Sequence, residues 1–500
     1  MAESVAVPSS SVVTPIRLAK AVGILAIIAS GVCQEYGSGI NFVLVNSLGA
    51  YPTVAYLVPL AMLVAGIVLL PKVIMLMRFS AVMPRAGSTY VWLSRSLNLP
   101  VGFVVAFGWL VGECASTGFV AYAFGTFVGS TLSSAGVNAS WVTTPVGHMM
   151  VGLIAIWLLF WLHYSGIRNY GTFMTIFLIV VVATALIVMA YGFSTTQQTF
   201  SAAATKVLGS TPPAPSGAAS LAAFITVTTL FLQSYGGLTG STSLGGEAKD
   251  ATKAMPRGIF IAWLTAVVLF TLVALALFHA VPYWMVQPLV KAGHSDLATT
   301  PGLIGMIAPH AVAVLVNLLV MVIVGKTMAP AILDTSRYLF AWGEDKLLPS
   351  AFKHLSPNRT PDVALLVAGL LISLFLAEAS FFTWTLGVAL RAMTLVMVFG
   401  FIGIGVLNMR FNKSFESIPW AKQIAGYWYM PVVAILAIII AIVMFSSVVV
   451  VPNAPFFLQP GAQVVVAIAI GVIIYYVAKG KARAQGVNIY ESARAELPLD

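Results

Sequence analysis

Long apolar runs, separated by shorter polar stretches, repeat along the whole of this 500-residue chain. The hydrocarbon core of a bilayer is about 30 Å thick and takes roughly 20 residues of α-helix, a length that each run approaches or exceeds. The pattern therefore predicts an all-α integral membrane protein with twelve transmembrane helices. The runs cover residues 19–47, 53–77, 100–131, 146–164, 171–193, 219–243, 257–281, 309–333, 361–378, 382–408, 430–451 and 460–478.

The composition agrees with a lipid environment. Sixty per cent of the residues are apolar and 8% are charged, whereas a soluble domain has about 25% charged residues. The net charge of +10 does not indicate nucleic-acid binding, because the basic residues lie in short clusters rather than in one stripe. Cys33 and Cys114 lie inside apolar runs without metal-ligand spacing, so we interpret them as packing residues and expect no metal and no cofactor.

The placement of Lys and Arg predicts the orientation of the chain. An even number of spans puts both termini on one side, and basic residues concentrate in cytoplasmic segments. With the N-terminus inside, only Lys206 and Lys291 fall in outer loops. We therefore expect residues 1–18 and 479–500 to be cytoplasmic tails of a cell-membrane protein. The basic residues on the predicted cytoplasmic side are Arg17, Lys20, Lys72, Arg78, Arg85, Arg95, Arg168, Lys249, Lys253, Arg257, Arg337, Lys346, Lys353, Arg359, Arg410, Lys413, Lys422, Lys479, Lys481, Arg483 and Arg494.

Two of the apolar runs contain glycines and polar residues near their centres. The first run has the stretch Ser30–Asn41, and the sixth has Gln233–Gly240. Irregular backbone at membrane depth is tolerated where it lines a cavity or is buried in protein, whereas glycines alone also serve close helix packing. Because the interruptions fall in the first helix of two successive five-helix units, we predict discontinuous helices and a substrate site between inverted repeats. The repeats are 19–193 and 219–408, and two further helices follow in 430–478.

Four stretches of the chain resemble signatures of the amino acid–polyamine–organocation superfamily of permeases, and they occur in the order that the family has. That family has the leucine-transporter fold of two inverted five-helix repeats plus two extra helices. The resemblance covers most of the chain, and it implies the same fold and the same transport by alternating access. The stretches are Gly37–Ile40, Phe79–Leu93, Glu247–Arg257 and Ser336–Pro361.

The chain departs from the family pattern at three places. It has Arg78 where the family often has an acidic residue, Asp250-Ala251 in place of Asn-Pro, and Asp345-Lys346 in place of Asp-Gly. The resemblance puts these positions on the inner gate surface, so the departures concern gating rather than fold.

The interrupted first helix offers partners for the carboxylate of an amino acid. Backbone N–H groups at Gly37, Ser38 and Gly39, together with the dipole of a half-helix, are expected to bind it. Recognition by backbone alone accepts any amino acid and leaves selection to the surrounding side chains.

The interrupted sixth helix offers partners for the substrate's ammonium. Carbonyl groups released near Gln233, Ser234 and Gly236 are expected to accept its hydrogen bonds. Tyr235 is expected either to close over the ligand as an outer gate or to pack against the first helix.

Four charged residues lie in mid-membrane, where each charge costs about 2.5–3.5 kcal/mol on insertion scales. Glu35, Glu113, Lys326 and Arg391 must therefore face a cavity or one another, and purely structural buried pairs remain an alternative. In the resembling fold a sodium site lies between the first and eighth helices, where Lys326 is expected. An ammonium there would replace the cation, so we predict coupling to protons rather than to sodium, with Glu35 as the counter-charge of Lys326.

Selectivity is expected to depend on the third helix, which lines the substrate's side-chain pocket in the resembling family. There Glu113 and Thr117 fall on the pocket wall. An ionised Glu113 would favour cationic amino acids or polyamines, and a neutral one would favour polar or apolar amino acids. If Arg391 turns toward Glu113, the pair is neutral and the preference for cations disappears.

The inner gate is expected to contain Arg85, Arg337, Glu247 and Asp345, joined in cytoplasmic networks. The alternative for the two arginines is topology alone, since basic residues gather on this side in any case.

The sequence thus predicts a proton-coupled secondary transporter of amino acids, with cationic ones as candidates, and small-molecule substrates in a lipid bilayer. A polyamine or amine transporter and an amino acid exchanger are the alternatives, and a non-transporting sensor or a subunit of a larger complex is also compatible with the sequence. An enzyme is not expected, because the chain has no His-Glu-x-x-His helix, no paired helix aspartates and no convincing Ser/His dyad.

Overall fold

The computed structural model describes residues 18–215, 217–294, 296–451 and 454–490. Most of the predicted N-terminal tail, with Arg17, and the last ten residues, with Arg494, lie outside these ranges. The described residues are helical and contain no strand, and their one isolated β-bridge joins Val22 to Ala248.

Nine segments of the described residues are long and apolar enough to cross a bilayer. They confirm an all-helical integral membrane architecture and coincide with nine of the predicted apolar runs. The segments are Pro52–Val82, which contains α3 (Val58–Val68) and α4 (Leu70–Val82), α6 (Leu99–Ser134), α7 (Pro145–Tyr164), α8 (Ile167–Ser194), α12 (Ala251–Ala280), α15 (His310–Glu344), α16 (Asp362–Phe381), α17 (Trp384–Phe411) and α20 (Pro460–Ala484).

The remaining helices are shorter. A tenth candidate span is the pair α18 and α19, which are bent by 67° relative to one another. The shorter helices are α1 (Ile24–Glu35), α2 (Leu44–Ala50), α5 (Ser88–Ser96), α9 (Gln197–Leu208), α10 (Leu221–Leu232), α11 (Leu238–Thr242), α13 (Val286–Lys291), α14 (Thr300–Gly305), α18 (Pro419–Ala425) and α19 (Met430–Ser446).

The first and sixth apolar runs are interrupted in mid-course. Helix α1 ends at Glu35, Tyr36 has non-helical dihedral angles (φ −80°, ψ 86°), and a short π-helix, Gly39–Val43, leads into α2. Helix α10 ends at Leu232, and five residues in turns precede α11. The polar and glycine stretches of these runs therefore coincide with the ends of helices.

The two interruptions lie against each other, and glycine makes the contact close. A Cβ at Gly39 would overlap the side chain of Ser234, and one at Gly237 would lie 2.6 Å from the backbone nitrogen of Glu35. Because only a residue without Cβ permits such an approach, the glycines bring the two breaks together.

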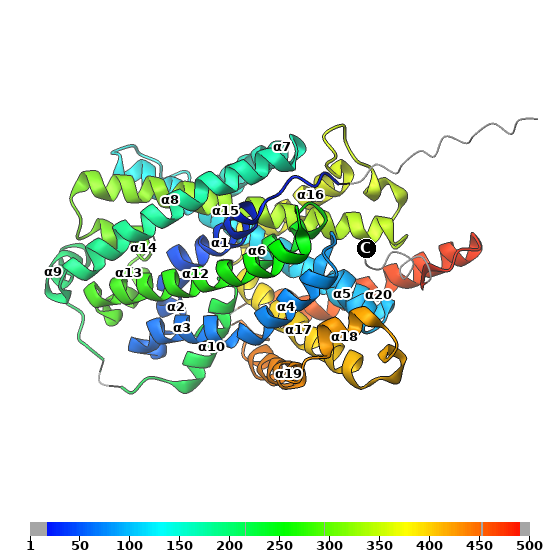
Figure 1. Ribbon diagram of the computed structural model, residues 1–500. Coiled ribbons are helices and arrows are strands. Elements are labelled where there is room, and N and C mark those ends of the chain that lie inside the picture. The colour runs from blue at the N-terminus through cyan, green and yellow to red at the C-terminus, as the bar shows by residue number, and fades with distance from the viewer. Residues whose placement is uncertain (1–17, 216, 295, 452–453, 491–500) are drawn as a thin grey trace, which may run out of the picture.

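Helices α6 and α17 form the centre of the bundle. In the most apolar stretch of α17, 83% of the residues are buried, against 28% in each of α7, α8 and α20. Figure 1 shows α7 at one edge of the bundle and α19 at the opposite edge. The peripheral helices present large apolar side chains on the surface, as lipid-facing helices do.

Lys72 was counted among the basic residues of the cytoplasmic segments, but the structure places it inside the helix bundle. The residue belongs to α4 within the continuous segment Pro52–Val82, and only 2% of its surface is exposed. Its ammonium lies 5.2 Å from the centre of the Trp109 ring, in the interior of the bundle. The predicted run 53–77 therefore contains a buried charge.

Close packing between α6 and α16 predicts the effect of a small substitution. A Cβ at Gly118 would lie 2.5 Å from backbone atoms of Phe375 and Leu376, whereas one at Gly480, in α20, meets nothing within 4 Å. We expect Gly118→Ala to destabilise the protein by about 1–3 kcal/mol through overpacking and Gly480→Ala to be neutral or slightly stabilising. Melting temperatures of the purified variants in detergent measure this, and equal values for the two would contradict the packing described.

Candidate functional site

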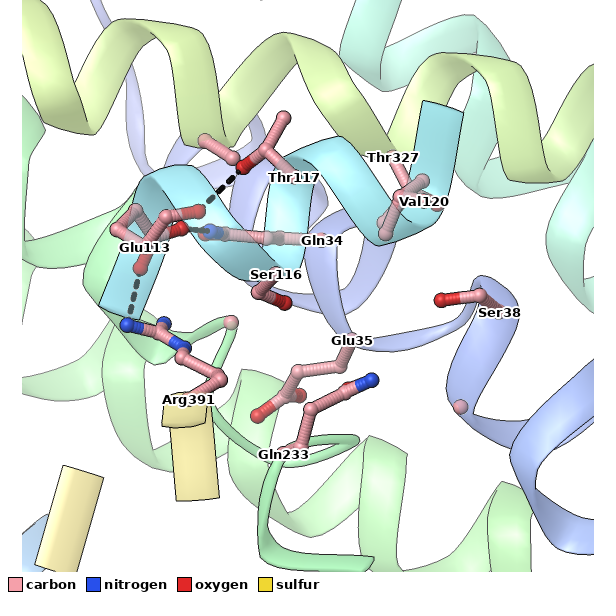
Figure 2. Close-up of a pocket in the computed structure, with 13 residues that line it drawn as sticks. Gln34, Glu35, Ser38, Glu113, Ser116, Thr117, Val120, Gln233, Thr327 and Arg391 are labelled. Atoms are coloured by element: carbon pink, nitrogen blue, oxygen red, sulfur yellow. Dashed lines mark hydrogen bonds and ion pairs between the residues drawn. The ribbon is translucent and has the colours of Figure 1, made fainter. Parts of the chain in front are cut away.

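A small cavity lies where the two helix breaks meet α6, α15 and α17. Its volume is about 20 Å³, enough for a water molecule and too small for an amino acid. Its lining residues include Ser38, Gly39, Gln233 and Gly237 from the breaks, Glu113 and Thr117 from α6, Thr327 from α15, and Arg391 from α17 (Figure 2). Polar groups from helices that are distant in sequence therefore line one small cavity.

Gly37, Ser38 and Gly39 lie at the start of the second half of the interrupted first run. The first N–H groups of a helix have no partner within that helix and attract anions. Ser38 and Gly39 line the cavity, and Gly37 lies against Thr327, whose side chain a Cβ would overlap. The segment thus presents helix-end donors at the cavity.

Most backbone carbonyl groups at the break in the sixth run, which the sequence predicted to be available to a substrate, already accept hydrogen bonds within the protein. The N–H groups of Gln233, Ser234, Tyr235 and Gly236 each donate to the carbonyl three residues earlier, at 3.0–3.2 Å. The carbonyl of Gly236 accepts a hydrogen bond from Arg391 at 3.4 Å. Tight turns and a side chain therefore occupy most of the acceptors expected here.

The side chains of residues 233–235 in the sixth run differ in their contacts. Gln233 Nε2 and Ser234 Oγ are buried without a hydrogen-bond partner among the described residues. Tyr235 instead donates from its hydroxyl to the carbonyl of Met62 at 3.0 Å and packs against Phe270. In this conformation Tyr235 contacts α3 and α12 rather than covering the cavity.

Glu113 and Arg391 form a buried ion pair at the cavity wall. Gln34 Nε2 also donates to Glu113, at 3.0 Å, and the Arg391 guanidinium lies 3.7 Å from the centre of the Trp109 ring. The other end of the Gln34 amide accepts from the N–H of Gly240 at 2.7 Å. Helix α17 thus turns Arg391 toward Glu113, and the charge of the glutamate is neutralised inside the protein.

Sequence reasoning missed two further charged residues near this pair. Lys72 is electrostatically attracted to Glu113, Glu35 and Asp334, and Asp334 accepts a hydrogen bond from Ser243. Lys72 lies inside the predicted apolar run 53–77, and Asp334 directly follows the run 309–333. The signal for Lys72 was its position within a run, and the signal for Asp334 was the helical pattern past residue 333, because α15 extends to Glu344.

Lys326 binds the backbone at the end of α1. Its ammonium donates to the carbonyl of Cys33, to that of Tyr36 at 2.8 Å, and to the Thr327 hydroxyl at 3.3 Å. The last carbonyls of a helix have no partner within it, so the ammonium caps the break. Glu35 is not among the groups that bind Lys326.

The predicted gate residues lie in separate ion pairs at one end of the bundle. We call this end, which contains residues 83–98, 244–250 and 337–349, the gate end. Arg337 binds Glu247 with two hydrogen bonds, of 2.7 and 3.3 Å, and both side chains are buried. The carbonyl of Glu247 also accepts from the N–H groups of Ala21 and Val22, each at 3.0 Å. The chain before α1 is thereby tied to the end of the sixth run.

Asp345 and Arg85 have other partners at the gate end. Asp345 accepts hydrogen bonds from Tyr90 and, at 3.0 Å, from Arg95. Arg85 lies 4.0 Å from Glu344 in a partly exposed pair. Arg95 had been attributed to topology alone, and its buried ion pair shows that it also joins α5 to the end of α15.

Comparison with known proteins gives the family. Residues 22–478 match the family described as amino acid permease. The "Low-affinity putrescine importer PlaP" of Escherichia coli is 26% identical over 330 residues, or 65% of this chain and 67% of the importer. The "Branched-chain amino acid permease BcaP" of Lactococcus lactis is 26% identical over 392 residues, or 72% and 75%. The "Cationic amino acid transporter 4, vacuolar" of Arabidopsis thaliana is 22% identical over 383 residues, or 74% and 59%.

The match extends over nearly the whole sequence, and the apolar helices agree with it. Members of this family are transporters rather than enzymes. The chain belongs to the amino acid permease family, within the amino acid–polyamine–organocation superfamily, and is a multi-pass membrane transporter of small molecules.

Proposed function

We propose that the protein is a secondary transporter of amino acids that works by alternating access. The observation that carries the proposal is the meeting of two helix breaks at one small polar cavity. The helix-end N–H groups at Gly37, Ser38 and Gly39 bind the substrate carboxylate, and the cavity widens when the protein opens to either side. The small volume of the cavity corresponds to a closed state between the two open ones.

The proposal includes the arrangement of the chain. When each interrupted run counts as one span, and the bent pair α18 and α19 as another, the nine long segments become twelve. Residues 19–193 and 219–408 then form inverted repeats, followed by two helices in 430–478. The excess of basic residues supports a cell-membrane protein with both termini in the cytoplasm.

The ion pair between Glu113 and Arg391 supports selection of neutral amino acids. A lone buried carboxylate favours cationic substrates because pairing relieves its desolvation cost. Here Arg391 already provides that pairing, so the wall near Glu113 and Thr117 favours neither lysine nor arginine. The name of the Lactococcus relative, a branched-chain amino acid permease, agrees with this preference.

A second candidate is the transport of amines such as putrescine. The name of the Escherichia coli relative points to that class, and the cavity has one acidic side chain, Glu35, without a hydrogen-bond partner among the described residues. Uptake assays with both classes of substrate separate the two candidates.

Coupling to protons is assigned to Lys326. Its ammonium occupies the junction of α1 and α15 and is bound by carbonyl and hydroxyl oxygens, which are also the ligands that a sodium ion would take. A protein cation at this place removes the need for sodium. Loss of the proton would free the carbonyls at the break and loosen the contact between the two helices. The gate-end ion pairs of Arg337 with Glu247 and of Arg95 with Asp345 then hold that side closed between transport steps.

The first prediction tests transport itself. Purified protein in liposomes, assayed with a panel of labelled amino acids, should accumulate at least one neutral amino acid. Gly39→Leu should abolish uptake because its side chain would overlap Ser234 and force the two breaks apart. Gly480→Leu, at an open helix position, is the control that should retain uptake. Normal uptake by Gly39→Leu would rule out the site at the breaks.

The second prediction concerns selectivity. Arg391→Gln leaves Glu113 without its cationic partner, so lysine and arginine should become better inhibitors of uptake relative to alanine, by tenfold or more. Adding Glu113→Gln in the same chain should restore the original order. Competition assays measure both ratios. If lysine and arginine already outcompete alanine with the native protein, selection of neutral substrates by this pair is wrong.

The third prediction concerns coupling. Native protein should take up substrate faster under an inward proton gradient and should not need sodium. Lys326→Ala should lose this stimulation while retaining substrate exchange, because the proton-binding group is gone. Lys479→Ala, at the exposed end of α20, is the control. A requirement for sodium in native protein would contradict the assignment.

A further inference from the structure

A substrate amine needs hydrogen-bond acceptors, and the backbone around the cavity has few to spare. Lys326 binds the carbonyls of Cys33 and Tyr36 at the break in the first run. Arg391 donates to the carbonyl of Gly236, and successive turns use the carbonyls of residues 230–233. Each of these oxygens already accepts at least one hydrogen bond, so a substrate ammonium would have to share it with a protein donor.

Glu35 provides a different kind of acceptor. It is the last residue of α1, it lines the cavity, and only 1% of its surface is exposed. Neither carboxylate oxygen has a hydrogen-bond partner among the described residues. Figure 2 shows the carboxylate between the side chains of Arg391 and Gln233, directed into the pocket.

The other acidic side chains nearby differ from Glu35 in their partners or their place. Glu113 also lines the cavity, but it is bound by Arg391 and Gln34. Asp334 accepts from Ser243 at one oxygen and has no hydrogen-bond partner at the other among the described residues, but it does not line the cavity. Lys72 attracts Glu35 through the field of its charge, without a hydrogen bond. Glu35 is thus the carboxylate of the pocket that still has its hydrogen-bonding capacity.

We propose that Glu35 binds the protonated amine of the substrate. This inference rests on the proposed function and specifies its substrate class as molecules with a protonated amine. A buried carboxylate without a partner is unfavourable, so an ammonium that supplies hydrogen bonds and charge is bound strongly. A site built for such a contact rejects an analogue that lacks it, because the carboxylate then stays unpaired. Gln233 Nε2, a donor without a partner in the same pocket, suits a substrate oxygen.

The test compares amines with analogues in which hydroxyl replaces amine: leucine with 2-hydroxy-4-methylpentanoate, and putrescine with 1,4-butanediol. Native protein, Glu35→Gln and the control Glu378→Gln are assayed for inhibition of uptake in liposomes and for ligand-induced shifts of melting temperature in detergent. Glu378 lies in α16, binds Gln463 and does not line the cavity. The Glu35→Gln change keeps the shape of the side chain and removes its charge.

Native protein and Glu378→Gln should prefer the amine of at least one pair strongly, and Glu35→Gln should reduce that preference at least tenfold. The melting temperature of unliganded Glu35→Gln should equal or exceed that of native protein, because an unpaired buried charge is removed. An unchanged preference in Glu35→Gln overturns the inference while native uptake still supports the transporter. A lower melting temperature with unchanged preference would show a structural role beside Lys72. If native protein neither binds nor transports any amine, both the inference and the proposed function fail.

Discussion

The break in the first run depends on one requirement, that backbone polar groups inside a bilayer be hydrogen-bonded. Ending α1 at Glu35 leaves its last carbonyls without helical partners. Lys326 of α15 donates to the carbonyl of Cys33, in the last turn of α1, and to that of Tyr36, directly after it. The side chain of Gln34 accepts a hydrogen bond from the backbone N–H of Gly240 in the sixth run. The interruption is stable only because α15 and the sixth run lie against it. The break, and the cavity beside it, therefore depend on the packing of these segments.

Buried charges, like buried backbone groups, need partners inside the protein. Breaking a buried pair costs about 3–5 kcal/mol because the remaining charge has no compensation, and the bundle arranges its charged side chains accordingly. Arg391 binds Glu113 and lies over the Trp109 ring, and the Lys72 ammonium lies 5.2 Å from the centre of the same ring. Protein cations thereby hold positions near the breaks that would otherwise attract an ion or a cationic substrate. Glu35 is the carboxylate of the pocket without a hydrogen-bond partner among the described residues, and the proposed binding of amines rests on it.

The sequence predicted the elements better than their pairings. Apolar runs mark the long helices because lipid requires about 20 apolar residues for each crossing, and the glycine-rich stretches mark the places where α1 and α10 end. Local sequence does not specify how a helix is rotated, so the contact of Arg391 with Glu113 remained one of several alternatives. Lys72 and Arg95 were assigned to the cytoplasmic side by charge counting, which cannot recognise partners that belong to distant helices. A polar stretch in the sequence also does not show whether its backbone carbonyls are free. In the sixth run, the N–H groups of residues 233–236 each bind the carbonyl three residues earlier.

Helix α15 connects the cavity mechanically to the gate end. Lys326 and Arg337 are eleven residues apart on it, roughly 16 Å at the rise of an α-helix. One binds the end of α1, and the other binds Glu247 at the end of the sixth run. The N–H groups of Ala21 and Val22 also bond to Glu247, so the halves of both interrupted runs nearest the gate end are tied to each other and to α15. Moving those halves away from α15 would break the contacts of Lys326 and of Arg337 in the same step. Opening at the gate end is therefore linked physically to rearrangement at the cavity, which alternating access requires.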